Sequence, residues 1–151
     1  MQKAIIFTKK GYEDKQKEYD ALLASRPDAV ADLAKARAMG DLSENGYYKS
    51  ARMKLSQVDR DLRQLKYILR FGKVQESSNN GIVDVGSVVT ITTGTITKTY
   101  EIVGTYEANP SKGKLSSSSP LGRVLLGKKV GDTAILAIGE NKTIYDITAI
   151  L

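Results

Sequence analysis

Two carboxylates stand three residues apart in the short stretch from Gly40 to Asn45, which separates two long helix-like segments. Carboxylates before a helix commonly cap it, because they accept hydrogen bonds from its free N–H groups and favour its positive end. Asp41 or Ser43 could cap the second helix in this way, and Gly40 could end the first by adopting a left-handed backbone. Capping at a solvent-exposed turn explains the pair Asp41 and Glu44 only in part.

The chain of 151 residues contains neither cysteine nor histidine. This excludes thiol nucleophiles, disulfides, Cys/His zinc sites and every catalytic pairing of serine or cysteine with histidine. The length allows one domain or two small ones. No stretch approaches the roughly 20 apolar residues of a membrane helix, and the N-terminal apolar run is too short for a signal peptide. We therefore expect a soluble, cytoplasmic protein with no membrane partner.

The net charge of +6 is unevenly distributed. Residues 1–48 carry eight basic and eight acidic side chains, residues 49–80 carry eight and three, and residues 81–151 carry seven and six. The basic excess on the second helix-like segment suggests contact with nucleic acid or an acidic protein surface. A solvated basic face is the alternative, since lysine and arginine are good helix formers. The basic residues are Lys49, Arg52, Lys54, Arg60, Arg63, Lys66, Arg70 and Lys73.

The segment from about Tyr12 to Met39 has a helical pattern, preceded by a lead-in at residues 8–11. Proline removes a backbone hydrogen bond and crowds the preceding turn, so Pro27 predicts a kink or a break after Arg26. The apolar residues of this segment fit a heptad stripe. The stripe consists of Tyr12, Tyr19, Leu22, Ala29, Leu33 and Ala36.

The second segment has the clearest periodicity, with apolar residues at alternating steps of three and four. Such a helix needs an apolar partner, and the short connection predicts that the preceding helix packs antiparallel to it. Arms of this length form a rod of about 40 Å. The predicted seam consists of Tyr48, Ala51, Leu55, Val58, Leu62, Leu65 and Leu69.

Residues 72–82 have the composition of a linker, and the sequence then becomes rich in β-branched residues. Residues 88–93 and 99–103 predict one β-hairpin, and residues 134–138 and 143–150 predict another. Between them, Ser119 as N-cap, Pro120 at the first helical position and Gly127 past the end predict a short helix that covers one face of the sheet. We expect a small α+β domain in this half.

Short motifs at the tip and in the C-terminal half carry a resemblance to a known family. The tip is Gly-Asp-Leu-Ser-Glu-Asn at 40–45, followed by Tyr48, Ala51 and Arg52. Further along are Tyr-Glu-Ile-Val-Gly from residue 100, Ser-Pro-Leu-Gly-Arg from 119 and Leu-Gly-Lys-Lys-Val-Gly-Asp from 126. In this order, over nearly the whole chain, they strongly resemble the Gre transcript-cleavage factors, GreA and GreB. The moderate basic excess favours GreA.

The resemblance implies an α+β protein. Its parts would be an antiparallel coiled-coil hairpin at residues 1–75 with an acidic tip at 40–45, a linker at 76–82, and an FKBP-like β-sheet domain with a short helix at 83–151. The rod would enter the secondary channel of bacterial RNA polymerase while the C-terminal domain docks outside. The protein would stimulate cleavage of the 3′ end of backtracked nascent RNA, as an accessory factor rather than an enzyme, and we expect it to be a monomer.

By this resemblance, Asp41 and Glu44 match the family's tip carboxylates, which help hold a second Mg²⁺ and its attacking water in the polymerase active site. Mg²⁺ prefers oxygen ligands, and a metal-bound water needs no histidine because its pKa is already lowered. Two carboxylates alone make a poor Mg²⁺ site. The isolated protein should therefore bind no such metal and have no nuclease activity.

Other residues are candidates for RNA or polymerase contacts. Arg52 is the best candidate for a phosphate contact, whereas Arg37 could share that role or pair with the tip carboxylates. Ser119 and Pro120 could dock on polymerase or could simply cap a helix that closes the domain core. The remaining candidates for RNA or polymerase binding are Asn45, Arg60 and Arg63.

Two alternatives stay open. Inhibitory factors of the same fold occupy the same channel, but they carry extra acidic residues at the tip that this chain lacks. A prolyl isomerase or chaperone built on the FKBP-like half is disfavoured, because such sites are aromatic-lined and this half has only three tyrosines. Two departures from the family pattern lie beside the tip, where Tyr47 replaces a usual glutamate and Gly46 a common alanine.

Overall fold

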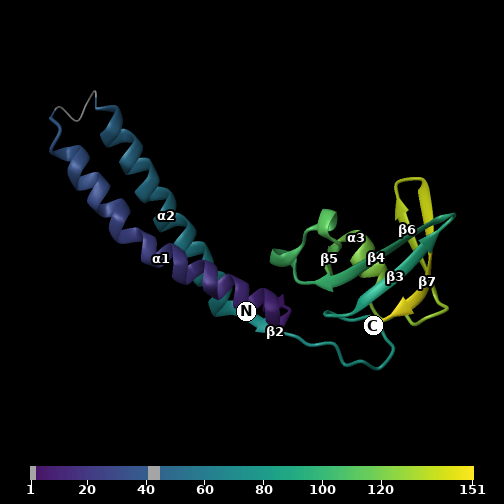
Figure 1. Ribbon diagram of the computed structural model, residues 1–151. Helices are drawn as coiled ribbons and strands as arrows, with labels where there is room; N and C mark the ends of the chain where they lie inside the picture. Colours follow the sequence, from purple (N-terminus) through teal and green to yellow (C-terminus); the bar gives the residue numbers. More distant parts are fainter. Residues whose placement is uncertain (1–2, 41–44) are drawn as a thin grey trace. The chain divides into compact units, whose positions relative to one another are not determined.

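A computed structural model of the chain describes residues 3–40 and 45–151. Contacts divide the chain into two compact units, one of Glu13–Phe71 and one that combines the segment up to Tyr12 with Gly72–Leu151. The first unit is a helical hairpin and the second is built on a β-sheet (Figure 1). The predicted α+β class is therefore confirmed. No helix in the part of the chain that the structure describes combines the length and apolar character needed to cross a bilayer.

Two long helices, α1 (Lys9–Arg37) and α2 (Gly46–Phe71), lie side by side and run antiparallel (Figure 1). The predicted seams face the inside of the hairpin except at Tyr12, which belongs to the other unit. Ala29, Ala36, Val58 and Leu65 are buried, and the other predicted seam residues are half-buried. Ile68, which the heptad pattern did not include, is buried as well. Periodicity therefore located the packing faces of both helices.

Helix α1 continues through Pro27, so the expected break after Arg26 does not occur, while a kink there stays a prediction. Proline costs the helix one hydrogen bond, but a contact with α2 holds the residue before it. The Arg26 guanidinium donates to both carboxylate oxygens of Asp59, with Nε–Oδ1 and Nη2–Oδ2 distances of 2.6 and 3.2 Å. This bidentate ion pair joins α1 to α2 one residue before the proline. Tertiary packing thus overrides the local preference for a break.

The Arg26–Asp59 pair makes hairpin stability pH-dependent. The hydrogen bond from Arg26 holds the pKa of Asp59 below its ordinary value of 3.8, against the opposing effect of desolvation. The carboxylate is thus favoured in the folded state, and its contribution is complete above pH 3.8 and lost as the pH falls through the folded pKa. We expect Asp59→Asn to lower the melting temperature at pH 7, and the difference from wild type to shrink at pH 3. The effect should be small, because exposed ion pairs contribute little.

Thermal unfolding followed by circular dichroism at both pH values measures this effect. Asp61→Asn is the matched control, since Asp61 lies on the same helix and accepts a hydrogen bond from the Gln57 amide at 2.7 Å. Its melting temperature relative to wild type should change little between the two pH values. A difference for Asp59→Asn that stays constant from pH 7 to pH 3 would contradict the assignment.

The second unit contains a five-stranded sheet with the order β5-β4-β3-β7-β6. All neighbours are antiparallel except β4 and β5, which are parallel. The two predicted hairpins are confirmed as β3 with β4 and β6 with β7. The strands are β3 (Val88–Thr93), β4 (Ile96–Val103), β5 (Lys114–Ser116), β6 (Thr133–Ile138) and β7 (Asn141–Ile150).

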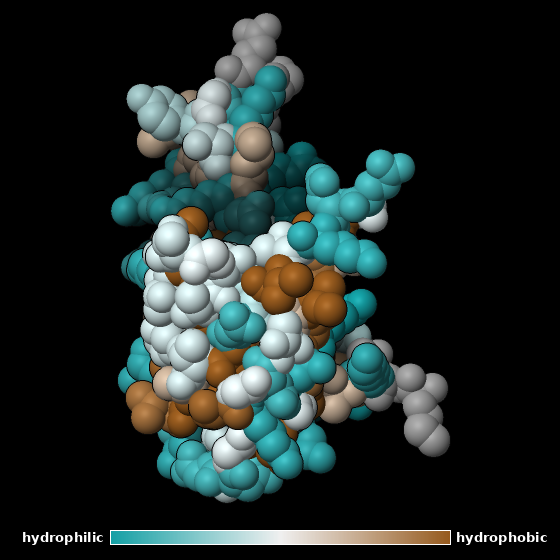
Figure 2. Space-filling model, turned by 90° about the vertical axis from the view of Figure 1, so that its right-hand side faces the viewer, coloured by the Kyte–Doolittle hydropathy of each residue, from teal (hydrophilic) through white to brown (hydrophobic). Residues whose placement is uncertain are grey.

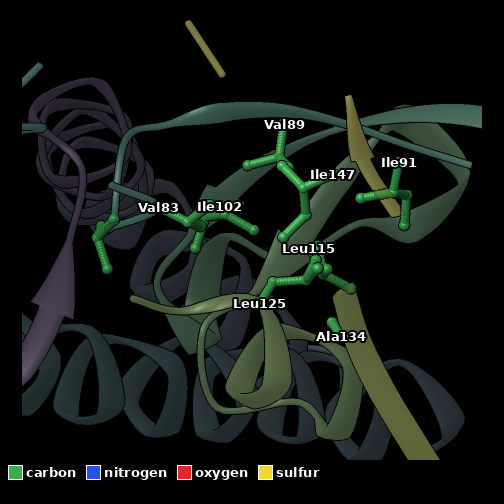
Figure 3. Packing of buried hydrophobic residues seen from close by; sticks show 9 residues of the cluster. Val83, Val89, Ile91, Ile102, Leu115, Leu125, Ala134 and Ile147 are labelled. Carbon is green, nitrogen blue, oxygen red and sulfur yellow. The ribbon is translucent and has the colours of Figure 1, made fainter. Parts of the chain in front are cut away.

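Helix α3 (Pro120–Leu125) contacts β5 and β6 and closes the core of this unit. Figure 3 shows Leu125 of α3 in the cluster with Leu115 of β5 and with side chains of the other strands. Short 3-10 turns, η1 (Thr105–Glu107) and η2 (Pro110–Lys112), connect β4 to β5. The core residues are Val83, Val85, Val89, Ile91, Ile102, Leu115, Leu125, Ala134 and Ile147.

Residues before Glu13 also belong to this second unit. Strand β1 (Ile5–Phe7) pairs in parallel with β2 (Gly72–Val74), within the stretch whose composition indicated a linker. Phe7 is fully buried, and its ring lies 5.8 Å from that of Tyr12 and 6.3 Å from that of Tyr106. Packing therefore joins the N-terminal strand to η1.

The Glu107 carboxylate fastens the start of α1 to η1. It accepts hydrogen bonds from the Thr8 N–H at 2.8 Å, from the Gly104 N–H at 3.0 Å and from the Thr8 hydroxyl. The Thr8 hydroxyl oxygen in turn accepts from the Gly11 N–H at 3.1 Å, so Thr8 caps α1. The helix therefore begins at Lys9, three residues before the predicted start.

Candidate functional site

The predicted metal-holding residues Asp41 and Glu44 lie outside the described residues, whereas both ends of the segment that carries them are described. Helix α1 ends at Arg37, and Gly40 has a φ of 115°. A positive φ at this position confirms the expectation that glycine ends the first arm, since other residues adopt it only with strain. Helix α2 begins at Gly46, which leaves residues 38–45 to connect the arms.

Asn45 joins the two arms of the hairpin at this end. Its side-chain oxygen accepts a hydrogen bond from the Tyr48 N–H at 3.1 Å, which makes Asn45 the N-cap of α2. Its side-chain amide donates to the Ala36 carbonyl at 2.8 Å, near the end of α1. The structure thus assigns the N-cap of α2 to Asn45, while the predicted candidates Asp41 and Ser43 lie outside the described residues. The Asn45 amide also satisfies a terminal carbonyl of the first arm.

A groove of about 290 Å³ lies between the arms beside this end. Ala36 and Ala51 line it from the two seams, and Tyr47 and Met39 stand at its edge with exposed fractions of 73% and 63%. In the sequence, Tyr47 stands out only as a departure from a family pattern. The small side chains of Ala36 and Ala51 in the two heptad stripes are the sequence feature that could have predicted a hollow between the arms here.

The basic candidates of α2 are exposed along one stretch of the helix. Arg52 and Arg60 line a shallow hollow of about 620 Å³ together with Lys49. Met53, 72% exposed, lies in the same hollow. Arg63 is exposed one turn further along, and Arg37 is exposed at the end of α1. A polyanion can therefore reach each of these predicted binding residues, and their role in binding stays a prediction.

Ser119 and Pro120 open helix α3 as predicted. The Ser119 hydroxyl accepts from the Gly122 N–H at 3.0 Å and donates to the Ser116 carbonyl at 2.6 Å, while Pro120 is the first helical residue. Gly122 is buried against this turn, where a Cβ would collide with the Ser116 carbonyl. The capping role of Ser119 is thus confirmed. Pro120 is exposed and available for a docking contact, which stays a prediction.

The β-sheet unit also exposes large apolar side chains. Figure 2 shows hydrophobic surface on this unit in patches separated by polar residues. Ile135 of β6 and Ile144 of β7 are directly opposite each other in the sheet and are each 55% exposed. Exposed apolar patches of this kind are typical of surfaces that contact other proteins.

The described residues, 3–40 and 45–151, contain no group of three or more acidic side chains that could hold a metal ion. Any metal site at the tip would thus draw on Asp41 and Glu44, which are oxygen donors of the kind that Mg²⁺ prefers. Two carboxylates are fewer ligands than this octahedral cation requires, so the remaining ligands would come from water or from a partner. The donor set therefore fits a shared site rather than a site complete in this chain.

Comparison with known proteins gives matches over both units. Residues 5–74 match the family model "Transcription elongation factor, N-terminal", and residues 78–151 match "Transcription elongation factor, GreA/GreB, C-term". Transcription elongation factor GreA of Mycoplasma capricolum is 37% identical over 139 residues, which cover 88% of each chain. GreA of Nautilia profundicola is 37% identical over 148 residues, which cover 95% of this chain and 91% of the relative.

Among solved structures, GreA factor homolog 1 (Gfh1) of Thermus thermophilus aligns over 99% of each chain. Its sequence is 24% identical to this chain, and the TM-score is 0.47.

Proposed function

The chain belongs to the GreA/GreB family of transcription elongation factors, and on that premise we propose that it stimulates RNA cleavage by bacterial RNA polymerase. In this proposal the hairpin enters the secondary channel of a backtracked polymerase and brings Asp41 and Glu44 to the extruded 3′ end of the RNA. The polymerase performs the hydrolysis, and this protein is its accessory factor. The observation that carries the proposal is the family match over both units, with this acidic pair in the connection between the arms.

The shape of the hairpin supports the proposal. Helices of 29 and 26 residues form a narrow rod about 40 Å long. The Arg26–Asp59 pair and the Asn45 bridge hold its arms together at the middle and at the end. Such a rod can carry a charged tip into a channel while its stem remains folded.

The carboxylates suit the chemistry of a two-metal hydrolysis. Asp41 and Glu44 would supply oxygen ligands for a second Mg²⁺ that polymerase alone holds weakly. When bound, this metal stabilises the charge that develops on the cleaved phosphate and lowers the pKa of the attacking water. The contribution of this chain is to deliver two fixed negative charges where they complete the set of ligands.

The basic surface of α2 and the β-sheet unit have supporting roles in this proposal. Arg52, Arg60 and Arg63 would attract the RNA backbone, since phosphate contacts position a nucleic acid without reading its sequence. Arg37 would do the same from the other arm or would pair with the tip carboxylates. The β-sheet unit would dock on the outside of polymerase through Pro120 and the capped turn of α3. Asn45 would act mainly by closing the end of the hairpin.

An RNA cleavage assay tests the proposed function. Polymerase elongation complexes are stalled in a backtracked state with RNA labelled at its 5′ end, and the full chain is added at several Mg²⁺ concentrations. We expect faster shortening of the labelled RNA, with the largest acceleration at low Mg²⁺, where polymerase alone is least saturated with the second metal. Binding without acceleration, or slower cleavage and synthesis, would instead identify a channel-occupying inhibitor and overturn the proposal.

A further inference from the structure

The groove beside the end of the hairpin is built from matching rows of the two arms. Each arm contributes residues at i, i+3, i+4 and i+7, starting from Asp32 on α1 and from Tyr47 on α2. This spacing places four side chains on one face of α2 and three on one face of α1, with Met39 in the turn that follows α1. The groove is therefore formed by the packing of the two antiparallel arms and does not depend on a single side chain.

Small residues make the groove hollow. Ala36 is 3% exposed and Ala51 is half-buried, and both occupy seam positions. At the position of Ala51 the next two heptads of α2 carry Val58 and Leu65, whereas at the position of Ala36 the preceding heptad of α1 also carries an alanine, Ala29. An alanine side chain fills less of the space between two helices than a leucine side chain does, so the surface between the arms is recessed beside these alanines. The floor is apolar, and it lies next to the segment that carries Asp41 and Glu44.

An aromatic ring stands beside this apolar floor. Tyr47 is 73% exposed and Met39 is 63% exposed, although both could gain by burial. An exposed tyrosine beside a hollow presents the face of its ring to a ligand at a low entropic cost, because the side chain has only two rotatable bonds. The groove thus offers one stacking surface and one thioether side chain.

The charges around the groove favour an anionic ligand. Lys35 on α1 and Lys54 on α2 line it from opposite arms, and Asp32 is the one acidic residue among the described residues that line it. Arg52, exposed on α2 close to Lys54, adds to the positive potential. An aromatic ring flanked by cations is the arrangement that proteins use for single-stranded nucleic acids, where bases stack and phosphates are neutralised.

We propose that this groove is a nucleobase-binding subsite. Tyr47 stacks on one base of single-stranded RNA, and Lys35 and Lys54 neutralise the phosphates on either side of it. The volume of about 290 Å³ is at the lower limit of small-ligand pockets and suits one nucleoside. The proposal rests on the proposed function only for the source of the RNA, which would be the extruded 3′ end in a backtracked polymerase.

Binding of a short RNA to the full chain tests the subsite without polymerase. The probe is fluorescently labelled hexa-adenylate, and a hexamer with abasic sugars is its control. We expect Tyr47→Leu to weaken hexa-adenylate binding about 5- to 160-fold, because stacking is worth roughly 1–3 kcal/mol per base. Tyr47→Phe should bind within about twofold of wild type, because it keeps the ring. The abasic hexamer should bind weakly and respond little to Tyr47→Leu.

The charge part of the proposal has its own measurement. Lys54→Gln should reduce the slope of log affinity against log salt by about 0.7, the value for one phosphate contact on a single strand. Tyr67→Leu is the matched control, because Tyr67 is a 44% exposed tyrosine of the same helix outside the groove. This variant should bind hexa-adenylate like wild type.

Three outcomes would overturn the subsite. They are an unchanged affinity in Tyr47→Leu, equal binding of the abasic hexamer, and no detectable binding of hexa-adenylate by wild type at millimolar concentration. Weaker binding of Tyr47→Leu to polymerase without extruded RNA would assign the ring to a protein contact instead. If ring-dependent RNA binding holds while wild type fails to accelerate cleavage, the proposed function fails and the subsite stands.

Discussion

Replacing Asp41 or Glu44 by alanine is expected to lower factor-stimulated RNA cleavage by on the order of 100-fold at low Mg²⁺. Each substitution would remove one of the two carboxylates proposed to hold the second metal, which supplies several kcal/mol of charge stabilisation when it is bound. Because each 1.36 kcal/mol corresponds to a factor of ten in rate, the loss of about 3 kcal/mol gives this magnitude. Affinity for polymerase should stay unchanged, since the proposed docking surfaces lie elsewhere on the chain.

The dependence of the cleavage rate on Mg²⁺ concentration distinguishes a metal-binding role of Asp41 and Glu44 from a purely structural one. A weakened metal site fills at a higher concentration, so raising Mg²⁺ should restore part of the rate of either single variant. The double variant should recover less. Asp28→Ala is the matched control, since Asp28 is an exposed carboxylate of α1 at a distance from the tip, and it should cleave like wild type. Acceleration by the alanine variants equal to that of wild type would show that the carboxylates hold no metal.

Local sequence signals located much of the fold correctly. The seams of α1 and α2, the two β-hairpins and the cap of α3 each arise from residues a few positions apart, where periodicity and capping chemistry act directly. Ser119 shows this well, because the side chain that the sequence selects as N-cap accepts its hydrogen bond from Gly122, three residues later.

Features that depend on distant partners were missed for a physical reason. Arg26 and Asp59 are 33 residues apart, and Thr8 and Glu107 are 99 apart, so no local pattern reports either contact. The first contact helps keep α1 continuous through Pro27, and the second fixes its start at Lys9. For the same reason, the pairing of β1 with β2 gave no signal in a stretch whose composition indicated a linker.

The candidate site was predictable only in its residue types. The tip motif identified Asp41 and Glu44 by resemblance, and the basic surface of α2 followed from the charge count. The role of Asn45 could be recognised only in the structure, because several residue types in the motif can cap a helix. The distinguishing feature of Asn45 is the hydrogen bond from its side-chain amide to the Ala36 carbonyl on the other arm. The groove beside Tyr47 likewise depends on the register between two helices, which neither seam specifies alone.

Gly104→Ala is expected to destabilise the β-sheet unit by about 2–4 kcal/mol. Its φ of −73° suits alanine, so the backbone conformation is not the obstacle. An added Cβ would instead collide with the Ile6 carbonyl group, which is backbone and cannot rotate away. Strand β1 would have to shift, and the hydrogen bonds from Thr8 and Gly104 to Glu107 would weaken with it.

Urea unfolding of the full chain, monitored by the environment of its tyrosines, measures this loss. Gly46→Ala is the control, because a Cβ there meets nothing within 4 Å and alanine favours the helix by up to about 1 kcal/mol. Gly11→Ala should cost less than Gly104→Ala, since its Cβ would meet the Glu107 side chain, which can move at the expense of its hydrogen bonds. Equal stability of Gly104→Ala and Gly46→Ala would show that β1 does not pack against this turn in solution.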